Sequence, residues 1–248
     1  MLKQILILAV GSLMLLTTAA QPPKAAVGYF VNGKKLRDQG MFPEAMQSFK
    51  KAIALYKSYD SAYLEWSNLY LRINKVDSAV VVLKRAVKLN PGMVTAYTAL
   101  ATIYKNNRSD FDSALVNYQY ALKIDSSNKE VLYNIAWCYN AKLEYEKAII
   151  FSLKILDLDV NYKPAYNEMA HAYHASKKYD EALEQFKKYS TISTCDLPLY
   201  YSGLVYMELN RFDELQKVID QLNKINSPQK ADGLKKRWDV KKNQKPAN

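Results

Sequence analysis

Apolar residues recur along this chain at steps of three and four, the spacing of one helix face, most clearly in residues 164–189. The apolar face of a first helix there is formed by Tyr166, Met169, Ala170 and Tyr173. After a polar break at residues 176–180, the face of a second helix is formed by Ala182, Phe186 and Tyr189. Two amphipathic helices joined by a short turn make an αα-hairpin. Neither helix can bury its apolar face alone, so the pattern predicts neighbouring copies of the same unit.

Two landmark positions repeat along the chain in step with each other. The large position of the first helix is filled by Leu36, Tyr70, Tyr104, Tyr139, Tyr173 and Tyr206. The small position of the second helix is filled by Ala45, Ala79, Ala114, Ala148, Ala182 and Leu215. Successive members of each series lie 33 to 35 residues apart. This regular spacing indicates six tandem hairpins rather than a set of unrelated helices.

The pattern resembles the tetratricopeptide repeat, a helix-turn-helix unit of about 34 residues with aromatic, Leu-Gly, Tyr, Ala, Phe and Pro positions. The resemblance covers residues 26–229 and implies six copies, with boundaries at 26–59, 60–93, 94–128, 129–162, 163–195 and 196–229. It implies an all-α fold, a right-handed α-solenoid that stacks these repeats.

A basic tail, residues 230–248, follows the last repeat and is expected to add a C-terminal capping helix. The apolar face of that helix would consist of Ala231, Leu234 and Trp238. The basic residues expected to face solvent are Lys235, Lys236, Arg237, Lys241 and Lys242.

Small residues fill one position of every first helix and allow close helix approach. These residues are Gly33, Ser67, Ala101, Ala136, Ala170 and Gly203. A large substitution such as Ala170→Trp is therefore expected to overpack a helix contact and destabilise the array.

The resemblance also implies a concave groove lined by the second, fifth, ninth and twelfth residues of each repeat. The candidate partner-binding residues at these positions are Phe30, Arg37, Leu64, Asn68, Tyr133, Trp137, Asn140, Asn167, His171, His174, Tyr200, Leu204 and Met207. The third repeat offers Thr95, Thr98, Thr102 and Lys105 at the same positions. The large apolar members are typical of a partner site. The alternative is that the twist of the array or the C-terminal tail covers them.

Residues 1–20 read as a cleaved secretory signal, with Lys3, an apolar run at 5–16 and small residues up to Ala20. We expect a linker at 21–25 and an exported chain, periplasmic or secreted. The alternative is an uncleaved membrane anchor, although the apolar run is short for a spanning helix. The formal net charge is +11, with lysines spread over the chain, which is typical of an exported soluble protein. Export disfavours nucleic acid as a partner, whereas the tail could contact a membrane or an anionic polymer.

The sequence offers no catalytic constellation, so we expect no enzymatic activity and no cofactor. The only histidines, His171 and His174, lie three residues apart without a third metal ligand nearby, and we expect both to be solvated. The two cysteines, Cys138 and Cys195, are expected to be free and buried, although export would permit a disulfide. One subset of the family clamps chaperone C-termini with basic residues, but Leu64 and Thr95 stand in two of those places. The sequence therefore predicts a non-enzymatic scaffold that binds a peptide or protein in its groove. The alternative is a structural subunit of an envelope assembly or secretion complex that docks through its convex face or tail.

Overall fold

The computed structural model describes residues 21–243, which form thirteen α-helices and no strand. The predicted signal segment 1–20 and residues 244–248 lie outside the described residues. The helices are α1 (Lys24–Asp38), α2 (Phe42–Leu55), α3 (Asp60–Arg72), α4 (Val76–Leu89), α5 (Val94–Arg108), α6 (Phe111–Ile124), α7 (Lys129–Ala141), α8 (Tyr145–Leu158), α9 (Lys163–Ala175), α10 (Tyr179–Thr191), α11 (Leu197–Glu208), α12 (Phe212–Lys224) and α13 (Pro228–Asn243). Two predicted boundaries differ slightly, because α1 begins inside the expected linker and α13 begins inside the expected sixth repeat.

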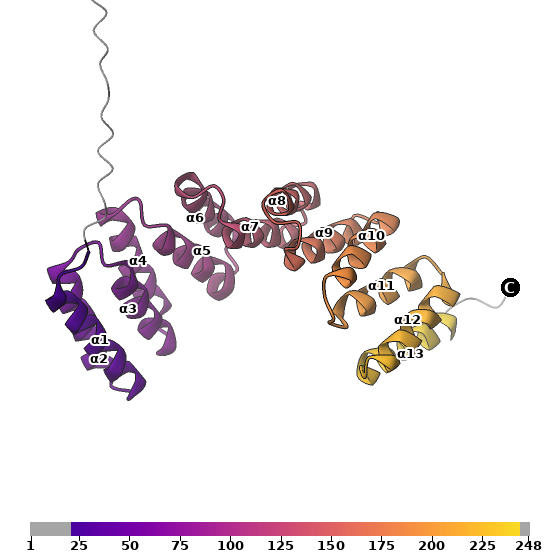
Figure 1. The fold of residues 1–248 in the computed structure, drawn as a ribbon, viewed down its shortest axis with the longest axis horizontal. Coiled ribbons are helices and arrows are strands. Elements are labelled where there is room, and N and C mark those ends of the chain that lie inside the picture. The colour runs from indigo at the N-terminus through magenta and orange to yellow at the C-terminus, as the bar shows by residue number, and fades with distance from the viewer. Residues whose placement is uncertain (1–20, 244–248) are drawn as a thin grey trace, which may run out of the picture.

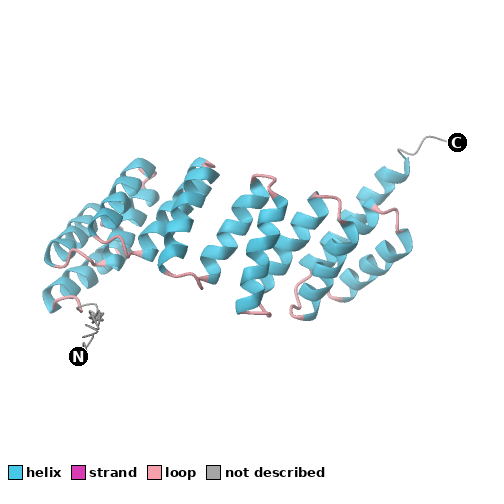
Figure 2. Ribbon diagram, turned by 90° about the horizontal axis from the view of Figure 1, so that it is seen from above, coloured by secondary structure: helices cyan, strands magenta, loops and turns pink. Residues whose placement is uncertain are grey.

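The helices stack as successive hairpins into an elongated, curved array, with its two ends far apart (Figure 1). In the middle of the arch, α5 and α7 lie toward the inner side and α6 and α8 toward the outer side (Figure 1). The view from above shows the same single row of helix pairs (Figure 2). The all-α solenoid predicted from the repeat pattern is confirmed.

Each hairpin turns through one residue with a left-handed backbone, at the same place in all six repeats. These residues are Gly40, Asn74, Ser109, Leu143, Lys177 and Asn210, with φ between 51° and 77°. Just after each of them, a backbone N–H donates to the carbonyl of the large landmark residue of the first helix, at 2.8–3.0 Å. One example is the bond from Glu144 to the carbonyl of Tyr139, 2.9 Å long. Such bonds satisfy carbonyls that a helix end leaves unpaired.

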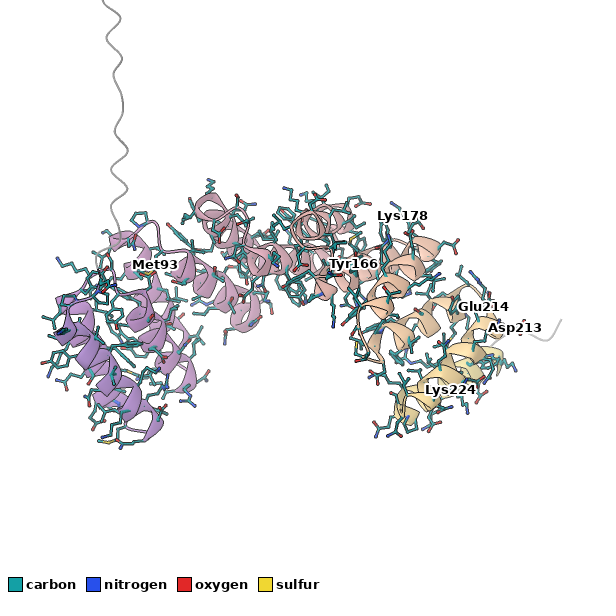
Figure 3. All side chains as sticks on the ribbon, viewed as in Figure 1. Met93, Tyr166, Lys178, Asp213, Glu214 and Lys224 are labelled. Atoms are coloured by element: carbon teal, nitrogen blue, oxygen red, sulfur yellow. The ribbon has the colours of Figure 1, made fainter. Side chains whose placement is uncertain are left out.

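The core runs along the array between the two helix layers. Its largest cluster extends from α2 to α9, and its fully buried large side chains include Tyr63, Tyr118 and Phe49. Met93 is 1% exposed where the chain passes from α4 to α5. Charged residues such as Lys178 and Asp213 project from the outer edge of the arch (Figure 3). A smaller, separate cluster holds α11, α12 and α13 together.

The predicted capping helix is present as α13, which packs against both α12 and α11. Leu234 is fully buried, and the ring of Trp238 stacks on Phe212 at 5.6 Å with planes 5° apart. The helix therefore stands where the first helix of a further repeat would stand. Among the tail residues predicted to face solvent, Lys241 is an exception because its ammonium donates to the carbonyl of Met207. The reason is that α13 crosses the end of α11, where helix carbonyls are unpaired.

Among the helices of residues 21–243, none combines the length and the apolarity that crossing a bilayer requires.

Candidate functional site

On the inner side, a hollow of about 440 Å³ lies over α3 and α5. Groove positions of three successive repeats line it: Leu64, Asn68 and Leu71, then Thr95, Thr98 and Thr102, then Glu130. The rest of the lining is Ser67, Ala99, Ile103, Asn106, Asn107 and Asn128. The hollow exists because the third repeat carries the short Thr98 and Thr102 where the fourth repeat carries Tyr133 and Trp137.

The walls of this hollow are apolar below and polar at the rim. The hydroxyls of Thr98 and Thr102 bond within their own helix, since Thr98 donates to the carbonyl of Val94 at 3.0 Å and Thr102 to that of Thr98 at 2.9 Å. The hydroxyl of Thr102 also lies 3.1 Å from that of Tyr118. The exposed amides of Asn68, Asn106 and Asn107 make no hydrogen bond to another described residue. The hollow can therefore accept an apolar side chain and offer free amides to a peptide backbone.

Two of the predicted aromatic residues stand beside this hollow but are engaged with neighbours. Trp137 is half-buried, with its ring 5.8 Å from Phe111 and the ammonium of Lys105 4.9 Å from its centroid. Tyr133 lies 6.5 Å from the ring of Tyr162, and burial raises its pKa, as do the charges of Glu168 and Tyr162. Both side chains are therefore half-buried in the wall of the fourth repeat.

Several polar residues predicted to bind a partner also join adjacent repeats. The twelfth residue of one repeat meets the sixth residue of the next. Arg37 pairs with Glu65 at 2.6 Å, and Asn140 donates to the carboxylate of Glu168 at 2.9 Å. The same register joins Lys105 to Asn134 at 2.6 Å. Arg37 and Asn140 thus stabilise the stacking of repeats.

The sixth position of each repeat was not predicted to join adjacent repeats. Its acidic or amide residues, on a mostly apolar helix face, could have indicated this contact. Glu168 is 5% exposed, and burial raises its pKa. Hydrogen bonds from Asn140 and Asn167 and the charge of Lys105 oppose that rise. Asn167 is half-buried, and its amide oxygen is shielded without a partner among the described residues.

The expectation of two solvated histidines is wrong for His171. Its ring stands edge-on to Tyr201 at 4.4 Å and to Phe186 at 5.8 Å, so it fills the contact between α9 and α11. Burial lowers the pKa of His171, and the nearby His174 lowers it further. His174 lies 5.7 Å from the ring of Tyr179. Within residues 21–243, no three His, Cys, Asp or Glu side chains gather closely enough to hold a metal ion.

The capping helix α13 determines how far the groove positions of the sixth repeat are buried. Met207 is 6% exposed and packs with Leu215 and Leu234, so its assignment to an open groove is wrong. Tyr200 and Leu204 are half-buried against the same cluster. The alternative that the tail covers these residues holds for Met207, because α13 occupies the next stacking place.

At the opposite end, Phe30 is half-buried between Phe49 at 5.8 Å and Tyr59 at 5.0 Å.

The two cysteines are free, but they differ in burial. Cys138 is fully buried, and burial raises its pKa to about 11. Cys195 is exposed, contrary to expectation, because the segment that links α10 to α11 runs over the surface.

The outer face exposes an apolar row that the sequence analysis did not single out. Val81, Val116 and Ile150 occupy equivalent places on α4, α6 and α8, and their exposed fractions are 67%, 51% and 51%. Their spacing of 34 to 35 residues would have indicated a common face.

Comparison with known proteins agrees with this architecture. The family model for the tetratricopeptide repeat protein 21 C-terminal ARM domain matches residues 51–170, and the tetratricopeptide repeat model matches residues 164–193. A repeat protein from Parabacteroides merdae ATCC 43184 superposes with a TM-score of 0.70 at 16% identity, over 90% of this chain and 88% of its own. YrrB, reported as a TPR protein with an unusual peptide-binding site, gives 0.61 at 20% identity, over 76% and 97%.

Among curated proteins, the Drosophila melanogaster protein O-mannosyl-transferase Tmtc3 is 30% identical over 120 residues. That match covers 48% of this chain and 13% of the relative. The chain spans between 13% and 37% of the length of the curated relatives it matches first.

The fold and the matched models define an all-α protein built of tandem helical hairpins. The chain belongs to the tetratricopeptide repeat family.

Proposed function

We propose that the chain is an exported, non-enzymatic scaffold that holds a peptide or an extended protein segment in its groove. The hollow over α3 and α5 is the main point of contact. The observation that carries this proposal is the alignment of groove positions from three repeats around one space of about 440 Å³. Repeat folds with such inner surfaces generally bind protein segments.

The chemistry of the hollow describes the segment it would hold. An apolar side chain of the segment packs against Leu64, Leu71 and Ile103, where burial of apolar area drives binding. The free amides of Asn68, Asn106 and Asn107 hydrogen-bond its backbone. Glu130 at one end favours a segment with a basic residue there.

The test uses Thr98→Tyr, which fills the hollow. The equivalent position is Tyr133 in the fourth repeat and Tyr200 in the sixth, so the larger side chain suits this place in the fold. Peptides are first selected on the unaltered chain from a random display library, and the affinity of the best one is measured for both proteins. We expect Thr98→Tyr to melt at the usual temperature and to bind at least roughly tenfold more weakly, a loss of about 1.4 kcal/mol.

The matched control is Thr191→Tyr, which adds the same side chain at an exposed place at the end of α10. It should leave the affinity unchanged. Equal binding by the Thr98→Tyr protein would remove the hollow from the proposal.

Export is a part of the proposal that rests on the sequence of residues 1–20. A basic start, a short apolar run and small residues before Gln21 are typical of a secretory signal. N-terminal sequencing of the protein isolated from its own cells tests this. We expect the chain to begin near Gln21, and an N-terminus within residues 1–20 would contradict cleavage near Ala20.

A second candidate is a structural subunit of an envelope assembly or secretion complex, docked through the outer face or the basic tail. The exposed row of Val81, Val116 and Ile150 favours it, since exposed apolar patches often mark contact surfaces. The exposed Lys235 and Lys236 of α13 would allow an anionic surface to be approached. Photo-crosslinking from position 116, compared with position 98, distinguishes the two candidates by which face yields the adduct.

A further inference from the structure

Polar side-chain bridges join the first helices of successive repeats along the inner wall. In each bridge, the twelfth residue of one repeat hydrogen-bonds the sixth residue of the next. Three joints are bridged in this way at 2.6–2.9 Å: Arg37 with Glu65, Lys105 with Asn134, and Asn140 with Glu168. These pairs occupy the first, third and fourth joints of the array.

The second joint, between α3 and α5, has no such bridge. Leu71 and Ala99 stand at its two bridge positions, and neither side chain can donate or accept a hydrogen bond. The side chain of alanine also ends at Cβ, so it reaches much less far than glutamate or asparagine. Both residues line the groove hollow of about 440 Å³. The hollow therefore opens where the other joints carry a pair of longer polar side chains.

The surroundings of the unbridged joint favour a large apolar group. Leu64 and Ile103 line the same hollow beside Leu71 and Ala99. Leu64, Leu71 and Ala99 are only partly buried, so an inserted apolar group would remove apolar surface from water. Of the residues that line this hollow in the described part of the chain, Glu130 alone is charged, and it is exposed. A basic group on the ligand would complement that charge.

We propose that the bound segment provides the missing bridge by inserting one aromatic side chain between Leu71 and Ala99. This inference rests on the proposed function and names the class of segment: one with an aromatic anchor and a basic residue that reaches Glu130. An aromatic ring buries about 150–250 Å² and has few rotatable bonds, so it fills such a space at low entropic cost. Ala99 determines the specificity, because its small size leaves room for the ring.

The first experiment needs no selected peptide. N-acetyl-tryptophanamide presents one aromatic side chain between two peptide groups. It is titrated into the full chain while the methyl signals of Leu71 and Ala99 are followed by ¹³C NMR. We expect both signals to shift saturably, with binding at least roughly tenfold tighter than that of N-acetyl-alaninamide. No saturable shift of either signal, or equal binding of the two amides, would overturn the proposal.

The charge preference is tested with two N-acetylated dipeptide amides that share the tryptophan and end in lysine or glutamate. The lysine form should bind more tightly at low salt, and Glu130→Gln should remove the difference. Equal or tighter binding of the glutamate form would overturn the assignment of a basic residue.

Variants of the full chain test the joint itself. Ala99→Leu narrows the hollow and should weaken binding of N-acetyl-tryptophanamide at least roughly tenfold. Leu71→Arg combined with Ala99→Glu places the pair of the first joint in the second and should have a similar effect. The matched control, Arg37→Leu combined with Glu65→Ala, removes the pair of the first joint outside the hollow lining and should leave binding within twofold. Thermal melting confirms that each variant is folded. An equal effect of the control and of the exchanged pair would overturn the proposal.

The result is separable from that of the proposed function. Display selection could yield peptides that Thr98→Tyr weakens but that lack an aromatic residue or bind equally to Ala99→Leu. The groove function would then stand, and the aromatic bridge would be wrong. If selection yields no peptide while N-acetyl-tryptophanamide still shifts Leu71 and Ala99, the proposed function fails and the aromatic site in the hollow stands.

Discussion

Small side chains on the first helices determine how closely the hairpins approach. A Cβ atom at Gly33 would lie 2.6 Å from the ring of Phe49, well inside van der Waals contact. Gly28 is on the same helix, and nothing lies within 4 Å of the place its Cβ would take. Close packing therefore requires a glycine at position 33, whereas position 28 has room for a larger side chain.

Substituting each glycine by alanine tests this difference. We expect Gly33→Ala to destabilise the fold by about 1–2 kcal/mol, because overpacking outweighs the helix propensity of alanine. Gly28→Ala should stabilise it by about 0.5–1 kcal/mol. Denaturant unfolding measures both free energies. If both substitutions raised the free energy of unfolding, or both lowered it, the packing of Gly33 on Phe49 would be contradicted.

The two thiols should differ sharply in reactivity. Cys195 is exposed. Its partial burial raises its pKa, but its hydrogen bonds with Ser193 and Tyr189 lower the pKa, and the net effect is a lowering. Cys138 is buried with a pKa of about 11, so it holds almost no thiolate at pH 8. We expect a colorimetric thiol reagent to label one cysteine rapidly in the native protein and the second only on unfolding. In Cys195→Ser the rapid phase should disappear, and its persistence would contradict the assignment.

The hairpin turns recur at the same place in every repeat, but the backbone strain in them differs from turn to turn. Five of the six hairpin turns place a residue other than glycine in the left-handed region. Leu143 is the bulkiest departure, with φ of 62° and 69% of its surface exposed. Leucine is unfavourable at this position, because the left-handed conformation costs a residue other than glycine about 1–2 kcal/mol.

Relief of that strain gives a prediction for the hairpin of α7 and α8. We expect Leu143→Gly to stabilise the protein by about 0.5–1 kcal/mol, because the relieved strain exceeds the added backbone entropy of glycine. The reverse change, Gly40→Leu in the first repeat, should destabilise by a similar amount. Melting temperatures of both variants test this, and a lower value for Leu143→Gly would refute it.

The contact between α9 and α11 should weaken in acid because of His171. Burial lowers the pKa of His171 below its usual value near 6.5, with His174 adding to the effect. The unfolded chain therefore binds the proton first, and the stability present above pH 6.5 falls as the pH drops below that value.

His171→Phe keeps the ring against Tyr201 and Phe186 but cannot take up a proton. Its melting temperature should fall less between pH 7 and pH 5 than that of the unaltered protein. His174→Gln, at the other histidine, should keep most of the original acid dependence. If the melting temperature of His171→Phe fell between pH 7 and pH 5 as much as that of the unaltered protein, another group would control the loss of stability in acid.

Along the array, the apolar core is divided into separate clusters of unequal size. The largest buried cluster spans α2 to α9, whereas α11, α12 and α13 share a separate, smaller one. In repeat proteins each unit contacts only its neighbours, so local stability follows local packing.

Hydrogen exchange should therefore reveal a gradient of protection. We expect backbone amides of α3 to α7 to exchange slowest and those of α11 to α13 to exchange sooner, as measured by mass spectrometry of peptides. Leu234→Ala, which removes a fully buried contact of α13, should accelerate exchange in α11 and α12 while α3 keeps its rate. Uniform protection over all thirteen helices would contradict separate clusters.

The periodic apolar residues by themselves determined the helices, the hairpins, the solenoid and the capping helix, since each of these depends on spacing within about 34 residues. Which side of each first helix forms the inner wall was implied by the resemblance to the tetratricopeptide repeat, and not by the apolar spacing. Which residues on this wall remain free was decided by contacts between repeats. Whether Asn140, His171 or Met207 is engaged depends on the side chain that the next helix brings against it. The hollow likewise opens at the short threonines of the third repeat because no neighbouring side chain is long enough to fill it.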